Sequence, residues 1–172
     1  MSSDGVVADG AVRAAWDACG ALDPGASAAS REAAEARVAA AVSEFGREEV
    51  SRGTLFLVGV LTGYLVAERP GGGAPSDPLT DLIPSVVRRL PAFPAAAPEH
   101  VPMATGLLMA AAMGMDTVAW RDGFGPLPAE EALLHGFVLR LLADLFDTLA
   151  GRPGVIDRLM RETFAAMGPE RD

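Results

Sequence analysis

The stretch from Gly53 to Ala67, GTLFLVGVLTGYLVA, contains no charged residue over fifteen positions. At 3.6 residues per turn its apolar side chains face every direction, which is typical of a helix enclosed by neighbours. Its Val and Thr residues would also suit a buried strand. No second strand is evident elsewhere, however, and one strand makes no sheet. The sequence therefore predicts a central helix over residues 47–68.

This stretch is short for a membrane span. Fifteen helical residues rise about 22 Å, whereas the hydrocarbon core of a bilayer is about 30 Å thick. Gly59 and Gly63 lie four positions apart and leave a shallow groove on one helix face, where another backbone can approach closely. We interpret the two glycines as packing positions and expect no membrane association.

A second apolar segment, residues 102–120, is interrupted only by Asp116 and two threonines. Alanine, the best helix former, dominates the composition, while the chain has only two Ile and one Tyr. Apolar residues recur at helical spacing in most other segments. We therefore predict an all-α bundle of about seven helices, with the helices at 47–68 and 102–120 at its centre. The others are expected over residues 11–22, 30–45, 78–90, 129–150 and 153–167.

Local signals mark the ends of these helices. Asp77 followed by Pro78 is typical of a helix start, whereas Gly46 and Gly151 are typical stops. The segment RPGGGAPSDP, residues 69–78, predicts a flexible loop. Residues 1–10, rich in Ser, Asp and Gly, predict a flexible N-terminus. A length of 172 residues then favours one helical domain over residues 11–172.

Charge and missing residue types exclude several functions. The net charge of -9 disfavours nucleic acids as partners, because nucleic-acid binding depends on Lys and Arg neutralising phosphates. The chain contains no Lys, so a Schiff-base lysine and a Walker A phosphate loop are both excluded. It also contains no Asn or Gln, which are the usual readers of adenine.

The single cysteine, Cys19, excludes an intramolecular disulfide and a multi-thiolate metal site. The sequence MSSDGVVADG shows no basic segment followed by an apolar run, as a secretory signal would. We therefore expect a cytoplasmic protein.

One pair of residues has the spacing of a chemical site. Glu131 and His135 lie four positions apart on the predicted helix 129–150, where they can share a proton or bind one metal ion. Burial would shift both pKa values and make the pair candidates for general acid and base. A helix-start carboxylate beside a hydrogen-bonded core histidine explains the same pattern and is the favoured interpretation.

Asp116 is a carboxylate in an otherwise apolar predicted helix and would need a partner there, such as Arg121, Arg140 or the hydroxyl of Tyr64. A solvated position near the helix end is the simpler explanation. Small-ligand pockets combine apolar walls with a few polar groups. One hypothesis is therefore a ligand-binding pocket formed by Tyr64, Asp116, Glu131 and His135.

No motif predicts a metal or a cofactor. Four methionines and His100 would suit copper(I), but helical core packing explains their spacing better. The Glu-x-x-His motif of di-iron bundles and the G-x-S-x-G motif of serine hydrolases are both missing from the sequence. The methionines concerned are Met103, Met109, Met113 and Met115.

With no catalytic motif, we expect a non-catalytic interaction protein that forms a homodimer or higher homo-oligomer, or binds another protein as an adaptor. The alternative is a protein that binds a small apolar molecule, or an enzyme, using the Glu131, His135 and Asp116 pocket. An exposed apolar patch would favour the first function, and an enclosed cavity lined by those polar residues would favour the second.

Overall fold

The computed structural model describes residues 7–22, 27–93, 96 and 98–168. These residues form eight α-helices, three short turns of π or 3₁₀ helix and no strand, so the predicted all-α fold is confirmed. The three short turns are Pro78–Leu82, Leu90–Ala92 and Pro98–His100. The α-helices are α1 (Asp9–Ala21), α2 (Ala28–Phe45), α3 (Arg47–Ala67), α4 (Ile83–Val87), α5 (Val101–Ala112), α6 (Thr117–Asp122), α7 (Ala129–Ala150) and α8 (Val155–Met167).

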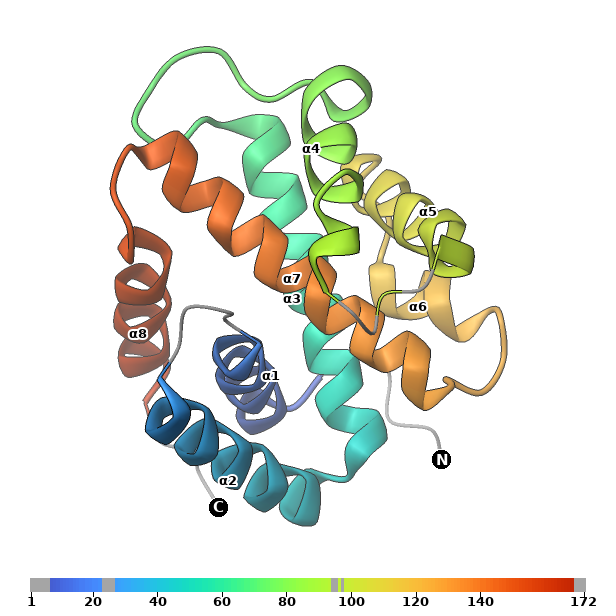
Figure 1. The fold of residues 1–172 in the computed structure, drawn as a ribbon, viewed down its shortest axis with the longest axis vertical. Coiled ribbons are helices and arrows are strands. Elements are labelled where there is room, and N and C mark those ends of the chain that lie inside the picture. Colours follow the sequence, from blue (N-terminus) through green and yellow to red (C-terminus); the bar gives the residue numbers. More distant parts are fainter. Residues whose placement is uncertain (1–6, 23–26, 94–95, 97, 169–172) are drawn as a thin grey trace.

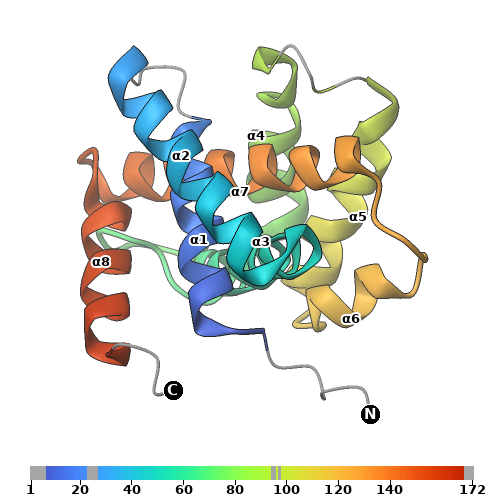
Figure 2. The same cartoon turned by 90° about the horizontal axis from the view of Figure 1, so that it is seen from below.

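The helices pack around one hydrophobic core, with α3 passing through the middle of the molecule (Figure 1). The long helix α7 lies against one side of α3, and α1 packs on α3 with α2 outside it. In Figure 2, α8 lies at one edge, and α5 and α6 lie at the other. Leu55, Val58 and Leu65 of α3 and Val138 and Leu142 of α7 are among the fully enclosed side chains.

The first predicted central helix is a single helix with almost the expected bounds, but the second is not. Instead of one helix over 102–120, α5 ends at Ala112 and α6 begins at Thr117. Gly114 between them has a positive φ of 73°, a conformation that glycine adopts without strain. Asp116 then caps α6. The single helix predicted over 102–120 is therefore two helices, α5 and α6, joined by a short link.

One face of α3 is open to solvent, contrary to the prediction that it is enclosed on all sides. Phe56, Val60 and Tyr64 are 45%, 48% and 38% exposed. They are spaced four residues apart, so they lie one above another on the same helix face. The apolar residues on the remaining sides of α3 are buried by α1, α5, α6 and α7.

Two glycines of α3 mark places where neighbouring elements come very close. A Cβ atom on Gly53 would lie 2.7 Å from the backbone oxygen of Ala11, so α1 and α3 meet there almost backbone to backbone. A Cβ on Gly59 would lie 2.8 Å from Oγ1 of Thr117, at the start of α6. The expected packing role is thus present at Gly59. At Gly63 an added Cβ would meet open space.

Within the described ranges, α3 is the one helix long and apolar enough to cross a membrane by length and composition. Half of the apolar window is buried inside the protein. Because the core helix of a globular domain passes the same test, this finding is weak evidence in either direction. The absence of membrane association stays a prediction.

Several predicted helix ends are confirmed. Oδ1 of Asp77 accepts hydrogen bonds from the backbone N–H groups of Leu79 and Thr80, at 2.9 and 2.8 Å, and Pro78 opens the π turn. Gly151 ends α7 in the left-handed conformation. Pro84 lies near the start of α4, so the helix predicted over 78–90 is divided between the π turn and α4.

Polar side chains hold α8 at both ends. Asp147 of α7 accepts hydrogen bonds from the N–H groups of Gly154, at 2.6 Å, and Ile156, at 3.0 Å. At the other end, Nη2 of Arg13 donates to the carbonyl oxygens of Phe164, at 2.6 Å, and Gly168, at 2.8 Å. A carboxylate at a helix start and a cation at a helix end both satisfy unpaired backbone groups and complement the helix dipole.

The structure describes only part of the predicted flexible N-terminus. Residues 1–6 lie outside the described residues, whereas Val7 is buried and residues 9 and 10 belong to α1. In the predicted flexible loop, Pro70 and Ser76 are buried, and the N–H of Ser76 donates to the carbonyl of Leu65 at 3.1 Å. The flexibility of both segments stays a prediction.

Candidate functional site

The four residues of the hypothetical ligand pocket lie in two separate places. Tyr64 and Asp116 line an open apolar groove beside α3, whereas Glu131 and His135 lie at the contact between α6 and α7. The expectation of one shared pocket is therefore corrected by the fold. Whether any of the four residues binds a ligand stays a prediction.

Asp116 has a backbone role that the sequence interpretation did not assign to it. Its Oδ1 atom accepts hydrogen bonds from the N–H groups of Val118, at 2.9 Å, and Ala119, at 3.0 Å, and so caps α6. The residue is exposed. The predicted partners, Arg121, Arg140 and the hydroxyl of Tyr64, are not needed, because the carboxylate lies at a helix start open to water.

Glu131 is paired with Arg121, whose side chain is only 3% exposed. Nε of Arg121 donates to Oε1 of Glu131, and Nη2 donates to Oε2 at 2.9 Å. Nη1 and Nη2 of the guanidinium also donate to the carbonyl oxygens of Gly125, at 2.9 Å, and Pro126, at 3.3 Å, respectively. This bidentate pair joins α6 to α7 and fixes the connecting loop, because a buried guanidinium needs partners for its donors.

His135 lies one helical turn beyond Glu131 and is fully buried. Its Nε2 atom is 3.5 Å from Oε1 of Glu131, and neither ring nitrogen forms a hydrogen bond within the described part of the chain. Burial lowers the pKa of His135 to about 4; the Glu131 charge raises this pKa and the Arg121 charge lowers it, both by less. At neutral pH the imidazole is therefore uncharged.

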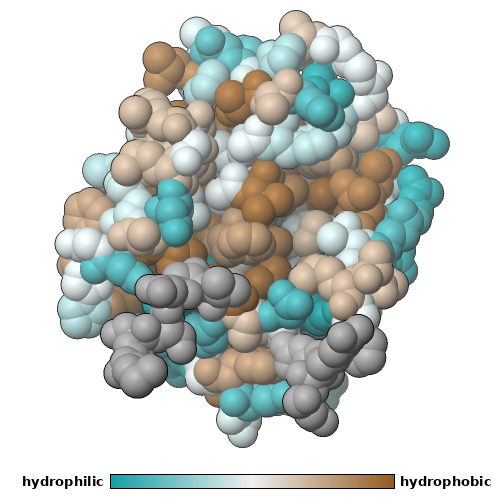
Figure 3. All heavy atoms as spheres, turned by 180° about the vertical axis from the view of Figure 1, so that it is seen from behind, coloured by the Kyte–Doolittle hydropathy of each residue, from teal (hydrophilic) through white to brown (hydrophobic). Residues whose placement is uncertain are grey.

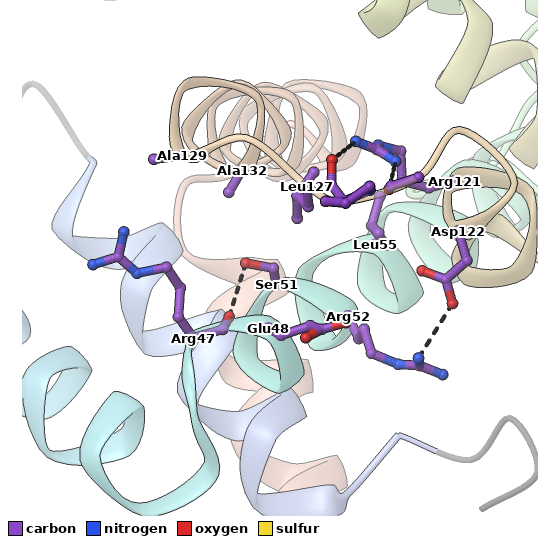
Figure 4. A pocket seen from close by; sticks show the side chains of 12 residues that line it. Arg47, Glu48, Ser51, Arg52, Leu55, Arg121, Asp122, Leu127, Ala129 and Ala132 are labelled. Carbon is purple, nitrogen blue, oxygen red and sulfur yellow. Dashed lines mark hydrogen bonds and ion pairs between the residues drawn. The ribbon is translucent and has the colours of Figure 1, made fainter. Parts of the chain in front are cut away.

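A cavity of about 590 Å³ lies next to Arg121, between the start of α3 and the α6–α7 loop (Figure 4). Its charged lining is mixed, since Arg47, Arg52 and Arg121 line it together with Glu48 and Asp122. Arg52 already pairs with Asp122 at 3.2 Å. Glu131 and His135 do not line this cavity. A lining that carries charges of both signs does not indicate which class of ligand the cavity would bind.

The larger opening is an apolar groove of about 840 Å³ between α3, α8 and the α5–α6 link. Figure 3, which looks at the side opposite to Figure 1, shows hydrophobic side chains gathered in the middle of this face. We use the term groove for this surface. Its main residues are Phe56, Val60, Gly63 and Tyr64 of α3, Leu159, Thr163 and Met167 of α8, Met115 and Asp116 of the link, and Asp9 of α1.

Tyr64 provides a hydroxyl at one side of the groove. Its ring contacts that of Phe146, with the centroids 5.5 Å apart. Partial burial raises the pKa of Tyr64, and the negative charge of Glu68 raises it further. The phenol is therefore neutral over the physiological range, and its hydroxyl is hydrogen-bonded to the Glu68 side chain.

Among the described residues, no three His, Cys, Asp or Glu side chains are grouped as a metal site would need. The four methionines that would suit copper(I) lie in different environments. Met103 and Met109 pack against the core, as expected. Met113 and Met115 are 71% and 47% exposed, because the helix ends before them. The prediction of core packing is therefore confirmed for Met103 and Met109 and wrong for Met113 and Met115.

Sequence reasoning missed two features of these sites. The sequence offers Arg121 as a partner for Asp116, whereas in the structure its partner is Glu131, ten residues later. The loop between them contains glycine and proline, which allow the chain to reverse, and this was an available signal. The exposed residues Leu159 and Met167 of α8 gave no signal of their own, because they follow the ordinary apolar spacing of a packed helix.

Comparisons with protein-family models, with curated proteins and with solved structures found no match to this chain.

Proposed function

We propose that this chain is a non-catalytic helical protein that binds a protein partner, and that the groove is its binding surface. The observation that carries the proposal is the open face of α3, where Phe56, Val60 and Tyr64 are exposed side by side. Single exposed apolar residues are ordinary, but a continuous apolar surface in a groove is typical of an interaction site.

The dimensions of the groove suit an α-helix as the bound element. From Phe56 to Tyr64 the helix rises about 12 Å, a little more than two turns. Leu159 and Met167 give the α8 wall the same length. An amphipathic helix that places apolar residues at positions i, i+3 or i+4, and i+7 in such a groove is a common mode of peptide recognition.

The placement of the reactive residue types also favours a non-catalytic role. Both carboxylate oxygens of Glu131 are engaged by Arg121, and His135 is enclosed in the core. A general acid or base must reach a substrate within hydrogen-bond distance. Here the candidates face each other inside the protein, so a role in joining α6 to α7 accounts for them.

A small apolar ligand is the second candidate, because the groove volume of about 840 Å³ lies in the usual range of small-molecule pockets. The groove is open to solvent, however, and few of its lining residues are polar. A helical segment would cover this shape more fully than a small molecule.

Binding of a labelled helical peptide, measured by fluorescence anisotropy, tests the proposed function. The probe has Leu at i, i+3, i+7 and i+10 and uncharged Gln at the other positions. We expect binding in the micromolar range, weakened about tenfold or more by Val60→Arg, because a buried charge at the centre of an interface is unfavourable.

Leu133→Arg is the matched control. Leu133 is 40% exposed on α7 and does not line the groove, so its substitution should leave peptide binding unchanged within about twofold. Equal weakening by both variants, or no binding of the peptide, would overturn the proposal. Saturable binding of dodecanoate without any peptide binding would support the small-ligand alternative instead.

A further inference from the structure

The charged side chains that line the groove are acidic. Among the described residues that line it, the ionisable carboxylates are those of Asp9 and Asp116, and no Arg or His lines it. Both side chains are exposed. Glu68 follows Tyr64 by four residues and places a third carboxylate near the α3 face. The apolar floor is thus bordered by negative charge.

Two of these carboxylates lie toward different ends of the α3 face. Asp9 begins α1 close to the contact between Ala11 and Gly53, which is near the Phe56 end of the α3 face. Glu68 lies just beyond the Tyr64 end. An elongated occupant would therefore meet an acidic group near each of its ends.

Arg13 is a cation that touches the groove lining, and its guanidinium is hydrogen-bonded to the end of α8. Its Cζ atom lies 5.3 Å from the centroid of the Phe164 ring. Its Nη2 atom donates to the carbonyl oxygens of Phe164 and Gly168 at the end of α8. Arg13 compensates the helix end, and its single positive charge offsets only part of the charge of Asp9, Asp116 and Glu68.

A second copy of this chain is a poor electrostatic match for the groove. Each copy carries a net charge of -9. In a two-fold symmetric dimer the same surface patch meets itself, so the three carboxylates of one copy would approach those of the other. Like charges across an interface disfavour association, whereas a positively charged partner is attracted and steered by the same field.

We infer that the occupant of the groove is a basic amphipathic helix of a protein partner. Its apolar residues lie on the α3 face, and Lys or Arg residues at its flanks lie near Asp9, Asp116 and Glu68. This inference rests on the proposed function, because it names the class of partner that the groove selects.

Three peptides of identical apolar face test the inference. The Leu positions of the glutamine peptide are kept, and the flanking positions carry Lys in the second peptide and Glu in the third. Dissociation constants are measured at low and at moderate salt. We expect the Lys peptide to bind most tightly and the Glu peptide most weakly, with a ratio of about tenfold or more that shrinks as salt screens the carboxylates.

Two double variants separate local charge from the charge of the whole protein. Asp9→Asn with Asp116→Asn removes two border charges and keeps the α6 cap, because Asn caps helices as well as Asp. Glu48→Gln with Glu130→Gln removes two exposed charges at helix starts outside the groove. The first variant should reduce the preference for the Lys peptide several-fold, and the second should leave it nearly unchanged.

The outcomes distinguish the two proposals. If the three peptides bind with equal affinity, and Val60→Arg still weakens them, the inferred basic partner is wrong and the proposed function stands. If no peptide binds, both proposals fail. A homodimer that Val60→Arg dissociates and Leu133→Arg does not would identify a second copy as the occupant and overturn the inference. Equal effects of the two double variants would also overturn the inference. The preference for the Lys peptide would then depend on the net charge of the whole protein and not on the charges at the groove.

Discussion

The buried cluster of Arg121, Glu131 and His135 and the groove are opposites in composition and exposure. At the cluster, three ionisable residues are wholly or largely buried: Arg121 binds Glu131 and the backbone, and His135 is enclosed beside them. At the groove, apolar side chains of α3 are exposed to solvent. Buried polar groups and exposed apolar surfaces are the informative exceptions in a folded protein. Here the polar exception joins α6 to α7, and the apolar one is the surface that we propose for binding.

The largest expected effect tests the structural role of the cluster. Glu131→Ala leaves the buried guanidinium of Arg121 without its carboxylate, so the free energy of unfolding should fall by about 3–5 kcal/mol. Urea denaturation measures the loss. Asp122→Ala, which removes the more exposed pair with Arg52, should cost at most about 1 kcal/mol. Similar losses in both variants would contradict the assignment of Arg121 and Glu131 as a structural tie.

The next effect is the pH dependence that His135 contributes. In the unfolded chain its pKa is near 6.5, and in the folded protein it is about 4, so the unfolded state binds the proton first as pH falls. Stability should therefore fall from pH 6.5 toward pH 4, by about 3 kcal/mol in total from this residue. Above pH 6.5 His135 should contribute no pH dependence.

Urea denaturation at several pH values, compared between the natural chain and His135→Leu, measures this contribution. The variant should show a shallower decline between pH 6.5 and pH 4, whereas the slope above pH 6.5 should be the same in both proteins. Parallel stability curves over the whole range would show that the imidazole is not enclosed as described.

Two glycine variants of α3 test which face of this helix is packed and which is open. Gly59→Ala brings a Cβ against Thr117, whose hydroxyl is held by the carbonyl of Leu55 at 2.8 Å, so we expect a loss of about 1–3 kcal/mol. Gly63→Ala meets open space and improves helix propensity, so it should stabilise the protein by about 0.5–1 kcal/mol. Thermal unfolding measures both changes. If Gly63→Ala destabilises the protein, the α3 face is not open at that position.

Local sequence signals predicted much of the fold. The bounds of α7 and its stop at Gly151 follow from apolar spacing and from the conformational preference of glycine, both of which act within a few residues. The cap at Asp77 is equally local. The break between α5 and α6 also has a local signal, Gly114 followed by Asp116, but the apolar content of the segment outweighed it.

The sites were less predictable because they depend on contacts between distant segments. The spacing of Glu131 and His135 placed them together correctly, since residues four apart on a helix are neighbours. Their partner Arg121 is reached through a loop, and no helical periodicity extends across it. The apolar pattern of α3 is the same on all sides, so it gave no information on which side the other helices would leave uncovered.

The two polar ties of α8 have a consequence for how specificity can change. Of its described residues, only Ile156 and Met160 are buried, so Asp147 and Arg13 contribute much of what holds this wall of the groove in position. Neither side chain belongs to the lining. We therefore expect that substitutions of Asp147 or Arg13 would shift α8 and so change which helices the proposed binding surface accepts, while every residue of the lining stays the same.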